Sequence, residues 1–133
     1  KNKGIDVFID AMGQLNRNNG LGKEVLAFIL VPAGHAGANK ELLHNLELPY
    51  QAVTSTDLYL THYLNDSAND PVMNRIRAQK LRNSEEDKVK IFFVPSYLNG
   101  DDGVFNMPYY DLLVGMDLTA FPSFIKMQGI NLL

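Results

Sequence analysis

The residues KNKG at positions 1–4 place a lysine and a glycine directly before an apolar run with helical spacing. A helix N-terminus offers free backbone N–H groups and the positive end of the helix dipole. A glycine there lets an anion approach the backbone, and a lysine adds a compact positive charge. Lys3 and Gly4 are therefore candidates for a phosphate site. The alternative is a solvated turn without a ligand, and these four residues alone favour it, because lysine and glycine are common at helix starts.

A second stretch, PAGHAGAN at positions 32–39, places glycines between a predicted strand and a predicted helix. Strand, glycine-rich turn and helix is the layout of a phosphate-binding turn. However, Gly34 and Gly37 do not complete a dinucleotide-binding fingerprint, and no Lys–Ser or Lys–Thr pair follows them. We therefore predict a connecting loop at the carboxyl edge of a sheet, where ligands bind in open α/β folds.

Two tyrosines follow the second predicted buried strand, at 89–94. Tyr97 comes directly after this strand, and Tyr109 lies in the first turn of the next predicted helix. Aromatic rings at this edge of a sheet could stack on a nucleotide base. The alternatives are a loop anchor for Tyr97 and core packing for Tyr109. The adjacent Asp101 and Asp102 are predicted to form a turn, not a catalytic pair.

The histidines His35, His44 and His62 do not have the spacing of metal ligands, and the chain contains no cysteine. We therefore predict no metal site. His44 is expected to face solvent or to cap a local group. His62 interrupts the apolar stretch YLTHYL, and the favoured interpretation is a hydrogen-bonded histidine that performs no chemistry.

The bulk composition is that of one globular domain. The 133 residues suffice for a single core. A net charge of −3 and a pI near 5.5 give no basic field for nucleic acid or anionic lipid. We expect no membrane span, because no apolar stretch approaches the roughly 20 residues required, and no secretory leader. The absence of cysteine leads us to expect a cytoplasmic location.

Hydrophobic periodicity predicts alternating helices and strands. One stripe of a first helix contains Ile5, Phe8, Ile9, Met12 and Leu15. The further predicted elements are a strand at 25–31 that is buried on both faces, a short helix at 40–47, an extended piece at 58–63, a helix at 71–82, a buried strand at 89–94, a helix at 109–116 and a third strand at 118–121. This alternation implies parallel crossovers, so we predict an α/β fold with a Rossmann-like, doubly wound parallel sheet.

Four stretches of the chain resemble the glycogen synthases of animals, fungi and some bacteria. They occur in the family's order: KNKGIDVFIDAMGQLN, THYLNDSANDPVMNRIRAQKL, DKVKIFFVPSYL and YYDLLVGMDLTAFPS. The resemblance covers residues 1–124 and suggests a bacterial member of the family. Residues 125–133 do not match and are predicted to be an appended tail.

The resemblance implies part of the C-terminal, donor-nucleotide-binding half of a two-domain retaining glycosyltransferase. Such enzymes move glucose from UDP-glucose or ADP-glucose to the 4-hydroxyl at the end of glycogen or another α-1,4-glucan, with no cofactor. The family's lysine that meets the donor diphosphate corresponds to Lys3, which would stabilise charge on the leaving group. Gly4 would let the phosphates approach, and Tyr97 and Tyr109 would border the base.

The same resemblance implies that the chain is a fragment that begins just after a strand of the parent protein. The family's partner arginine, its two sugar-contacting glutamates and its acceptor-binding half are not among these 133 residues. We therefore expect the parent to be the enzyme and the fragment alone to be inactive. We also expect the parent to be a homo-oligomer. The alternative is a stand-alone flavodoxin-like binding or signalling domain without transferase activity. A receiver of that type would need acidic residues at the end of a first strand, whereas this chain starts with a helix.

Overall fold

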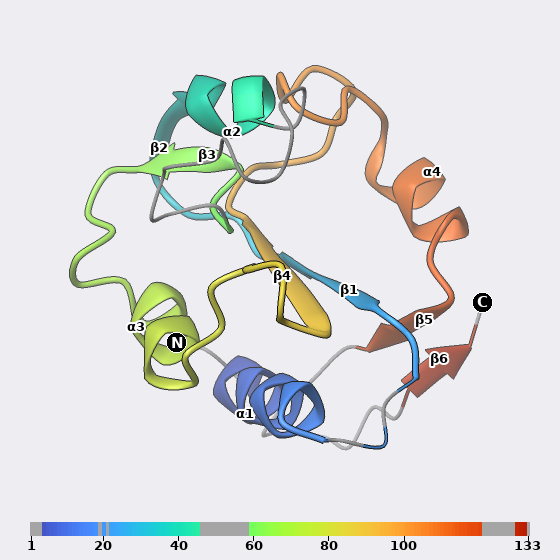
Figure 1. Cartoon of the computed structure of the whole chain (residues 1–133). Helices are drawn as coiled ribbons and strands as arrows, with labels where there is room; N and C mark the ends of the chain where they lie inside the picture. Colours follow the sequence, from blue (N-terminus) through green and yellow to red (C-terminus); the bar gives the residue numbers. More distant parts are fainter. Residues whose placement is uncertain (1–3, 19, 21, 46–58, 121–129, 133) are drawn as a thin grey trace.

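The computed structural model describes residues 4–18, 20, 22–45, 59–120 and 130–132, and Figure 1 shows its helices and strands. In chain order the elements are α1 (Ile5–Asn16), β1 (Val25–Leu30), β2 (His35–Ala38), α2 (Lys40–Asn45), β3 (His62–Leu64), α3 (Pro71–Ala78), β4 (Val89–Val94), α4 (Tyr109–Val114), β5 (Leu118–Ala120) and β6 (Ile130–Leu132). No helix within these ranges combines the length and the apolar character that crossing a membrane requires.

Parallel strands form the centre of the structure. β1 pairs with β4 in parallel over the whole length of both strands. On the other edge of β4, the backbone of residues 59–61 runs parallel to it through a bridge between Leu60 and Phe93. The Phe93 amide donates to the Tyr59 carbonyl at 2.7 Å, and the Thr61 amide donates to the Phe93 carbonyl at 3.1 Å. The predicted α/β class is confirmed, and the parallel strands are consistent with part of a Rossmann-like domain.

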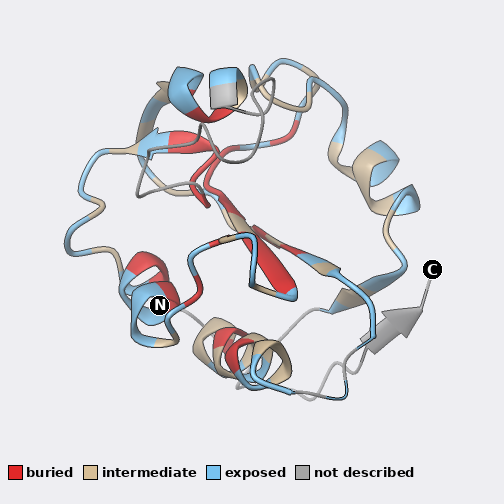
Figure 2. Cartoon of the chain, viewed as in Figure 1, coloured by how far each residue is buried: buried red, intermediate tan, exposed pale blue. Residues whose placement is uncertain are grey.

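The core lies between this sheet and the helices α1 and α3. Figure 2 shows buried positions along β4 and on the inner sides of both helices. The apolar stripe of α1 places Ile9 in the core, and α3 contributes Met73 and Ile76, all three without exposed surface. The strand residues of this core cluster are Ala27, Ile29, Val89, Ile91 and Phe93. Removing these apolar surfaces from water is the main force that holds the helices on the sheet.

The two central strands differ in how far they are buried. β4 is buried at every position except Phe92, as predicted. For β1 the prediction of burial on both faces is wrong, since Leu26 is 57% exposed and only Ala27 and Ile29 are fully buried. The physical reason is that α1 and α3 cover only one face of the sheet, so the alternate residues of β1 point away from them.

Helix α3 begins where the local signals predict and ends earlier. The side chain of Asp70 accepts hydrogen bonds from the amides of Val72 and Met73 at 2.9 and 3.0 Å, which caps the first turn. The helix ends at Ala78, before the predicted end at residue 82. Lys80 has a left-handed backbone with φ of 59°, and this conformation cannot continue a right-handed helix.

Helix α1 runs antiparallel to β4. Its last residue, Asn16, accepts a hydrogen bond from the amide of Val89 at 2.9 Å and donates to the side chain of Asp87 at 3.0 Å. The end of α1 is therefore fixed at the start of β4. The 12 residues of α1 span ~18 Å, and the six residues of β4 span ~20 Å. The N-terminus of α1 thus lies toward the carboxyl ends of β4 and of its parallel partner β1.

The prediction of a connecting loop at 32–39 is wrong, and the predicted third strand forms outside the central sheet. The glycine-rich stretch 32–39 is not only a loop, because it contains β2, which pairs antiparallel with β3. Gly37, with a φ of 110°, permits the irregular register that this pairing needs. The predicted third strand also exists, but it does not join the central sheet. As β5 it pairs antiparallel with β6, a partner that its own sequence does not reveal.

Candidate functional site

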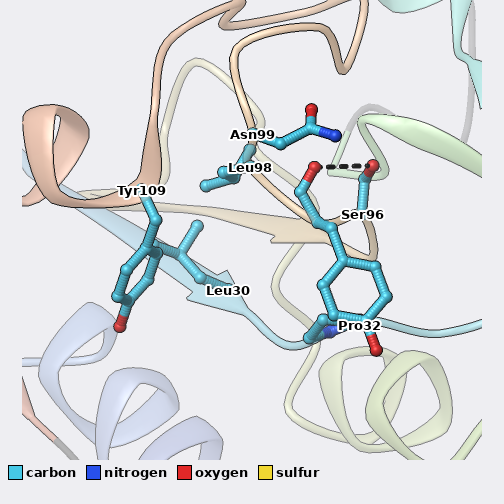
Figure 3. Close-up of a pocket in the computed structure, with 7 residues that line it drawn as sticks. Leu30, Pro32, Ser96, Leu98, Asn99 and Tyr109 are labelled. Carbon is cyan, nitrogen blue, oxygen red and sulfur yellow. Dashed lines mark hydrogen bonds between the residues drawn. The ribbon is translucent and has the colours of Figure 1, made fainter.

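A pocket lies at the carboxyl ends of β1 and β4, and Figure 3 shows its lining residues. Its volume is about 350 Å³, and its walls are formed by Leu30, Pro32, Ser96, Tyr97, Leu98, Asn99 and Tyr109. Leu30 ends β1, residues 96–99 follow β4, and Tyr109 begins α4. Ligands of open α/β folds bind at this edge, and a mostly apolar lining with a few polar groups is typical of small-molecule sites.

The two tyrosines chosen from the sequence line the same pocket. Tyr97 is 76% exposed, so packing does not bury its ring. Tyr109 is partly buried, and its amide donates to the carbonyl of Leu98 at 2.9 Å. A backbone bridge between Asn99 and Pro108 closes the loop just before it. The chain therefore returns after about ten residues and brings both tyrosines into the lining of one pocket.

Sequence reasoning missed Ser96 and Asn99, two polar residues that line the pocket, and Tyr110, which packs on the lining residue Tyr109. Ser96 adds a hydroxyl group and Asn99 adds an amide group to the lining. The ring of Tyr110 packs edge-to-face against Tyr109, with 5.4 Å between the ring centroids, and is 77% exposed. The helical stripe favours Tyr109 alone, because Tyr110 falls on the outer face of α4. Ser96 and Asn99 stand in a short loop whose polar residues carry no distinguishing local pattern.

The start of α1 has the backbone that the glycine predicts. Gly4 is buried and left-handed, with φ of 94° and ψ of 0°, a conformation strained for residues with a side chain. Its carbonyl accepts the first helical hydrogen bond, from the amide of Phe8 at 3.2 Å. Gly4 lies toward the same edge of the sheet as the pocket. Lys3 lies outside the described residues, so its position relative to the pocket stays a prediction.

Two of the histidines meet behind the loop that follows β4. His62 has no exposed surface, and its ring lies 4.8 Å from the ring of His35. His62 Nε2 is 2.8 Å from the carbonyl oxygen of Asp102, and Nδ1 is 2.8 Å from the hydroxyl of Thr61. Burial, together with the neighbouring His62 ring, lowers the pKa of His35. The prediction of a hydrogen-bonded His62 is confirmed.

Asp102 organises the turn that His62 contacts, as predicted for a turn-forming residue. Its carboxylate accepts hydrogen bonds from the amides of Val104, Phe105 and Asn106 at 3.0, 2.9 and 2.8 Å. Burial acts to raise the pKa of the Asp102 carboxyl, but these three amides hold its pKa below the ordinary value. Within the described ranges, no cluster of three or more histidines and carboxylates is arranged to hold a metal ion.

Comparison with known proteins decides the family. The family model described as glycogen synthase matches residues 49–131, which is more than half of the chain. The chain belongs to the glycogen synthase family. The match includes every pocket residue from Ser96 to Tyr109, whereas Gly4 and Leu30 precede it. Membership of this family decides against a stand-alone flavodoxin-like domain.

Curated relatives of this chain include glycogen [starch] synthases of yeast and rat. It is 28% identical to glycogen [starch] synthase isoform 2 and 26% identical to isoform 1 of Saccharomyces cerevisiae, over 97% of the chain and 27% of each relative. It is 23% identical to the liver glycogen [starch] synthase of Rattus norvegicus, over 96% of the chain and 25% of that protein. The chain thus spans about a quarter of the length of these relatives. The yeast alignments extend over 189 positions, so those relatives carry residues with no counterpart among these 133.

Proposed function

We propose that this chain is part of the donor-nucleotide half of a glycogen synthase. The full-length protein would transfer glucose from UDP-glucose or ADP-glucose to the 4-hydroxyl of an α-1,4-glucan end, with retention of configuration. The observation that supports this most is the pocket at the carboxyl edge of β1 and β4, much of whose lining lies within the segment matched by the family. The cysteine-free composition supports a cytoplasmic location.

In this proposal the pocket receives the nucleoside. Its volume of about 350 Å³ lies at the lower end of the range for small-molecule sites, which suits one part of a nucleotide sugar. The exposed ring of Tyr97 and the ring of Tyr109 offer faces on which a base can stack. Leu30 and Leu98 supply apolar contact, while Ser96 and Asn99 can hydrogen-bond to polar edges of the ligand.

The diphosphate would lie toward the start of α1. Glucosyl transfer breaks the bond between the anomeric carbon and the diphosphate oxygen, so negative charge grows on the diphosphate in the transition state. The left-handed Gly4 presents a side-chain-free backbone at the N-terminal end of α1, where the helix dipole is positive. The ammonium group of Lys3 would add a full charge beside the leaving group. Charges fixed where negative charge develops lower the barrier of the transfer.

A calorimetric titration of the full-length protein with uridine diphosphate and adenosine diphosphate tests this proposal. At least one nucleotide should bind, and the tighter one identifies the donor base. Because base stacking contributes roughly 1–3 kcal/mol per ring, Tyr97→Ala and Tyr109→Ala should each raise Kd about tenfold.

Tyr63→Ala is the matched control for these variants, since this tyrosine of β3 is 42% exposed and does not line the pocket. It should bind the nucleotide as the wild type does. The proposal fails if neither nucleotide binds, or if both pocket variants keep the wild-type Kd.

A further inference from the structure

We infer that His62 is a positioning residue for the nucleotide pocket, because it holds the loop of residues 99–108 that leads into Tyr109. This inference rests on the proposed function. His62 does not itself line the pocket, and its influence would pass through the backbone of the loop. Figure 1 shows this loop between β4 and α4, and its Asp102 carbonyl meets His62 of β3.

The hydrogen bonds of His62 assign the position of its proton. The carbonyl of Asp102 can only accept, so the Nε2 atom 2.8 Å from it carries the hydrogen. On the other side of the ring, Nδ1 therefore accepts from the hydroxyl of Thr61 at 2.8 Å, and the amide of Thr61 donates to the carbonyl of Phe93 at 3.1 Å. One buried imidazole thus connects the backbone of the loop to the end of β4. Losing it would leave the carbonyl of Asp102 without this donor.

Asp102 fixes the conformation of the residues that follow it in the loop. The carboxylate of Asp102 gathers the next amides into a turn, and the ring of Phe105 then packs edge-to-face on Phe28 of β1, with 6.1 Å between the ring centroids. The pairing of Asn99 with Pro108 closes the loop at the pocket. A shift of the Asp102 backbone therefore moves a closed unit whose two ends, at Asn99 and Tyr109, line the pocket.

The groups around His62 fix the orientation of its ring as well as the position of its proton. The ring of His35 from β2 lies against it at an interplanar angle of 60°, and Nδ1 of His35 accepts from the amide of Gly37 at 3.0 Å. The carboxylate of Asp102 is 3.9 Å from His62 Nε2. The two histidines are 27 residues apart in sequence and meet only because β2 pairs with β3.

Two substitutions of His62 separate positioning from simple occupancy of the core. The amide nitrogen of glutamine reaches the place of Nε2, whereas asparagine reaches only the place of Nδ1. In the full-length protein, His62→Asn should raise Kd for the nucleotide about tenfold, whereas His62→Gln should stay within about threefold of the wild type. Hydrogen exchange of residues 99–108 should become faster in His62→Asn only. His44→Asn is the control, since His44 is exposed on α2.

A variant of the loop itself tests the same path without touching the buried ring. Gly103 has a φ of 88°, and a Cβ added there would lie 3.2 Å from Cβ of Ala38. Gly103→Ala should therefore loosen the loop and speed its hydrogen exchange. It should also raise Kd for the nucleotide about tenfold, as expected for His62→Asn, and this test remains available even if His62→Asn does not fold.

The inference is overturned if His62→Asn and His62→Gln have the same Kd for the nucleotide and the same hydrogen exchange in residues 99–108. It is also overturned if Gly103→Ala speeds exchange of the loop without changing Kd. Absence of nucleotide binding by the wild type would instead overturn the proposed function, and the positioning role would fall with it. The exchange rates of the loop would still report whether His62 holds it.

Discussion

Lys3→Ala is expected to lower kcat for glucosyl transfer by the full-length protein on the order of 100- to 1,000-fold. The physical reason is that the diphosphate gains negative charge as the bond to the sugar breaks, so an adjacent ammonium group stabilises the transition state more than the bound donor. The structure supports this placement through Gly4, whose left-handed backbone stands at the N-terminus of α1. The measurement is the steady-state incorporation of labelled glucose into glycogen.

Lys23→Ala is the matched control for this experiment. Lys23 is an exposed lysine in the segment between α1 and β1. Its loss removes one positive charge without touching the start of α1, so kcat should match that of the wild type. If Lys3→Ala keeps kcat and KM within about twofold of the wild type, the assignment of Lys3 to the diphosphate is wrong.

Asn83→Ala is expected to lower the free energy of unfolding by about 3 kcal/mol. The side chain of Asn83 acts as a partner for the edge of β4: its amide donates to the carbonyl of Ile91, and its oxygen accepts from the Ile91 amide, both at 2.7 Å. Asn83 is only 5% exposed, so alanine would leave two buried backbone groups of β4 unpaired. The midpoint of urea unfolding measures the loss.

A matched variant separates the hydrogen bonds from the backbone conformation. Asn83 has a φ of 52°, which alanine adopts less readily than asparagine, and this alone contributes part of the cost. Lys80 has a similar φ of 59° but an exposed side chain. Lys80→Ala should therefore cost much less than Asn83→Ala. Equal losses in the two variants would mean that the contacts with Ile91 do not stabilise β4.

The elements with a local cause could be predicted from the sequence. The apolar stripe of α1 and the apolar run of β4 carry their own periodicity, and Asp70 with the following proline sets the start of α3. Pairings between distant segments could not be predicted in this way. The stretch 35–38 becomes a strand because β3 lies beside it, and β5 finds its partner in β6.

In the candidate site, too, features with a local cause could be predicted and contacts between distant segments could not. Tyr97 and Tyr109 could be chosen because each stands at a predictable carboxyl edge, and the structure places both in one pocket. The hydrogen bond between His62 and Asp102 joins residues that are 40 apart in the sequence, so no local pattern predicts it. Sequence reasoning recognises His62 as unusual in an apolar stretch, but the loop that it holds becomes visible only in the fold.

The central claim is that the pocket at the carboxyl ends of β1 and β4 receives the nucleotide of a glucosyl donor. A crystal structure of the full-length protein with uridine diphosphate or adenosine diphosphate tests it most directly. We predict the nucleoside between Leu30, residues 96–99 and Tyr109, with the diphosphate toward Gly4 and Lys3. A nucleotide bound at the opposite edge of the sheet, where β1 and β4 begin, would contradict the account.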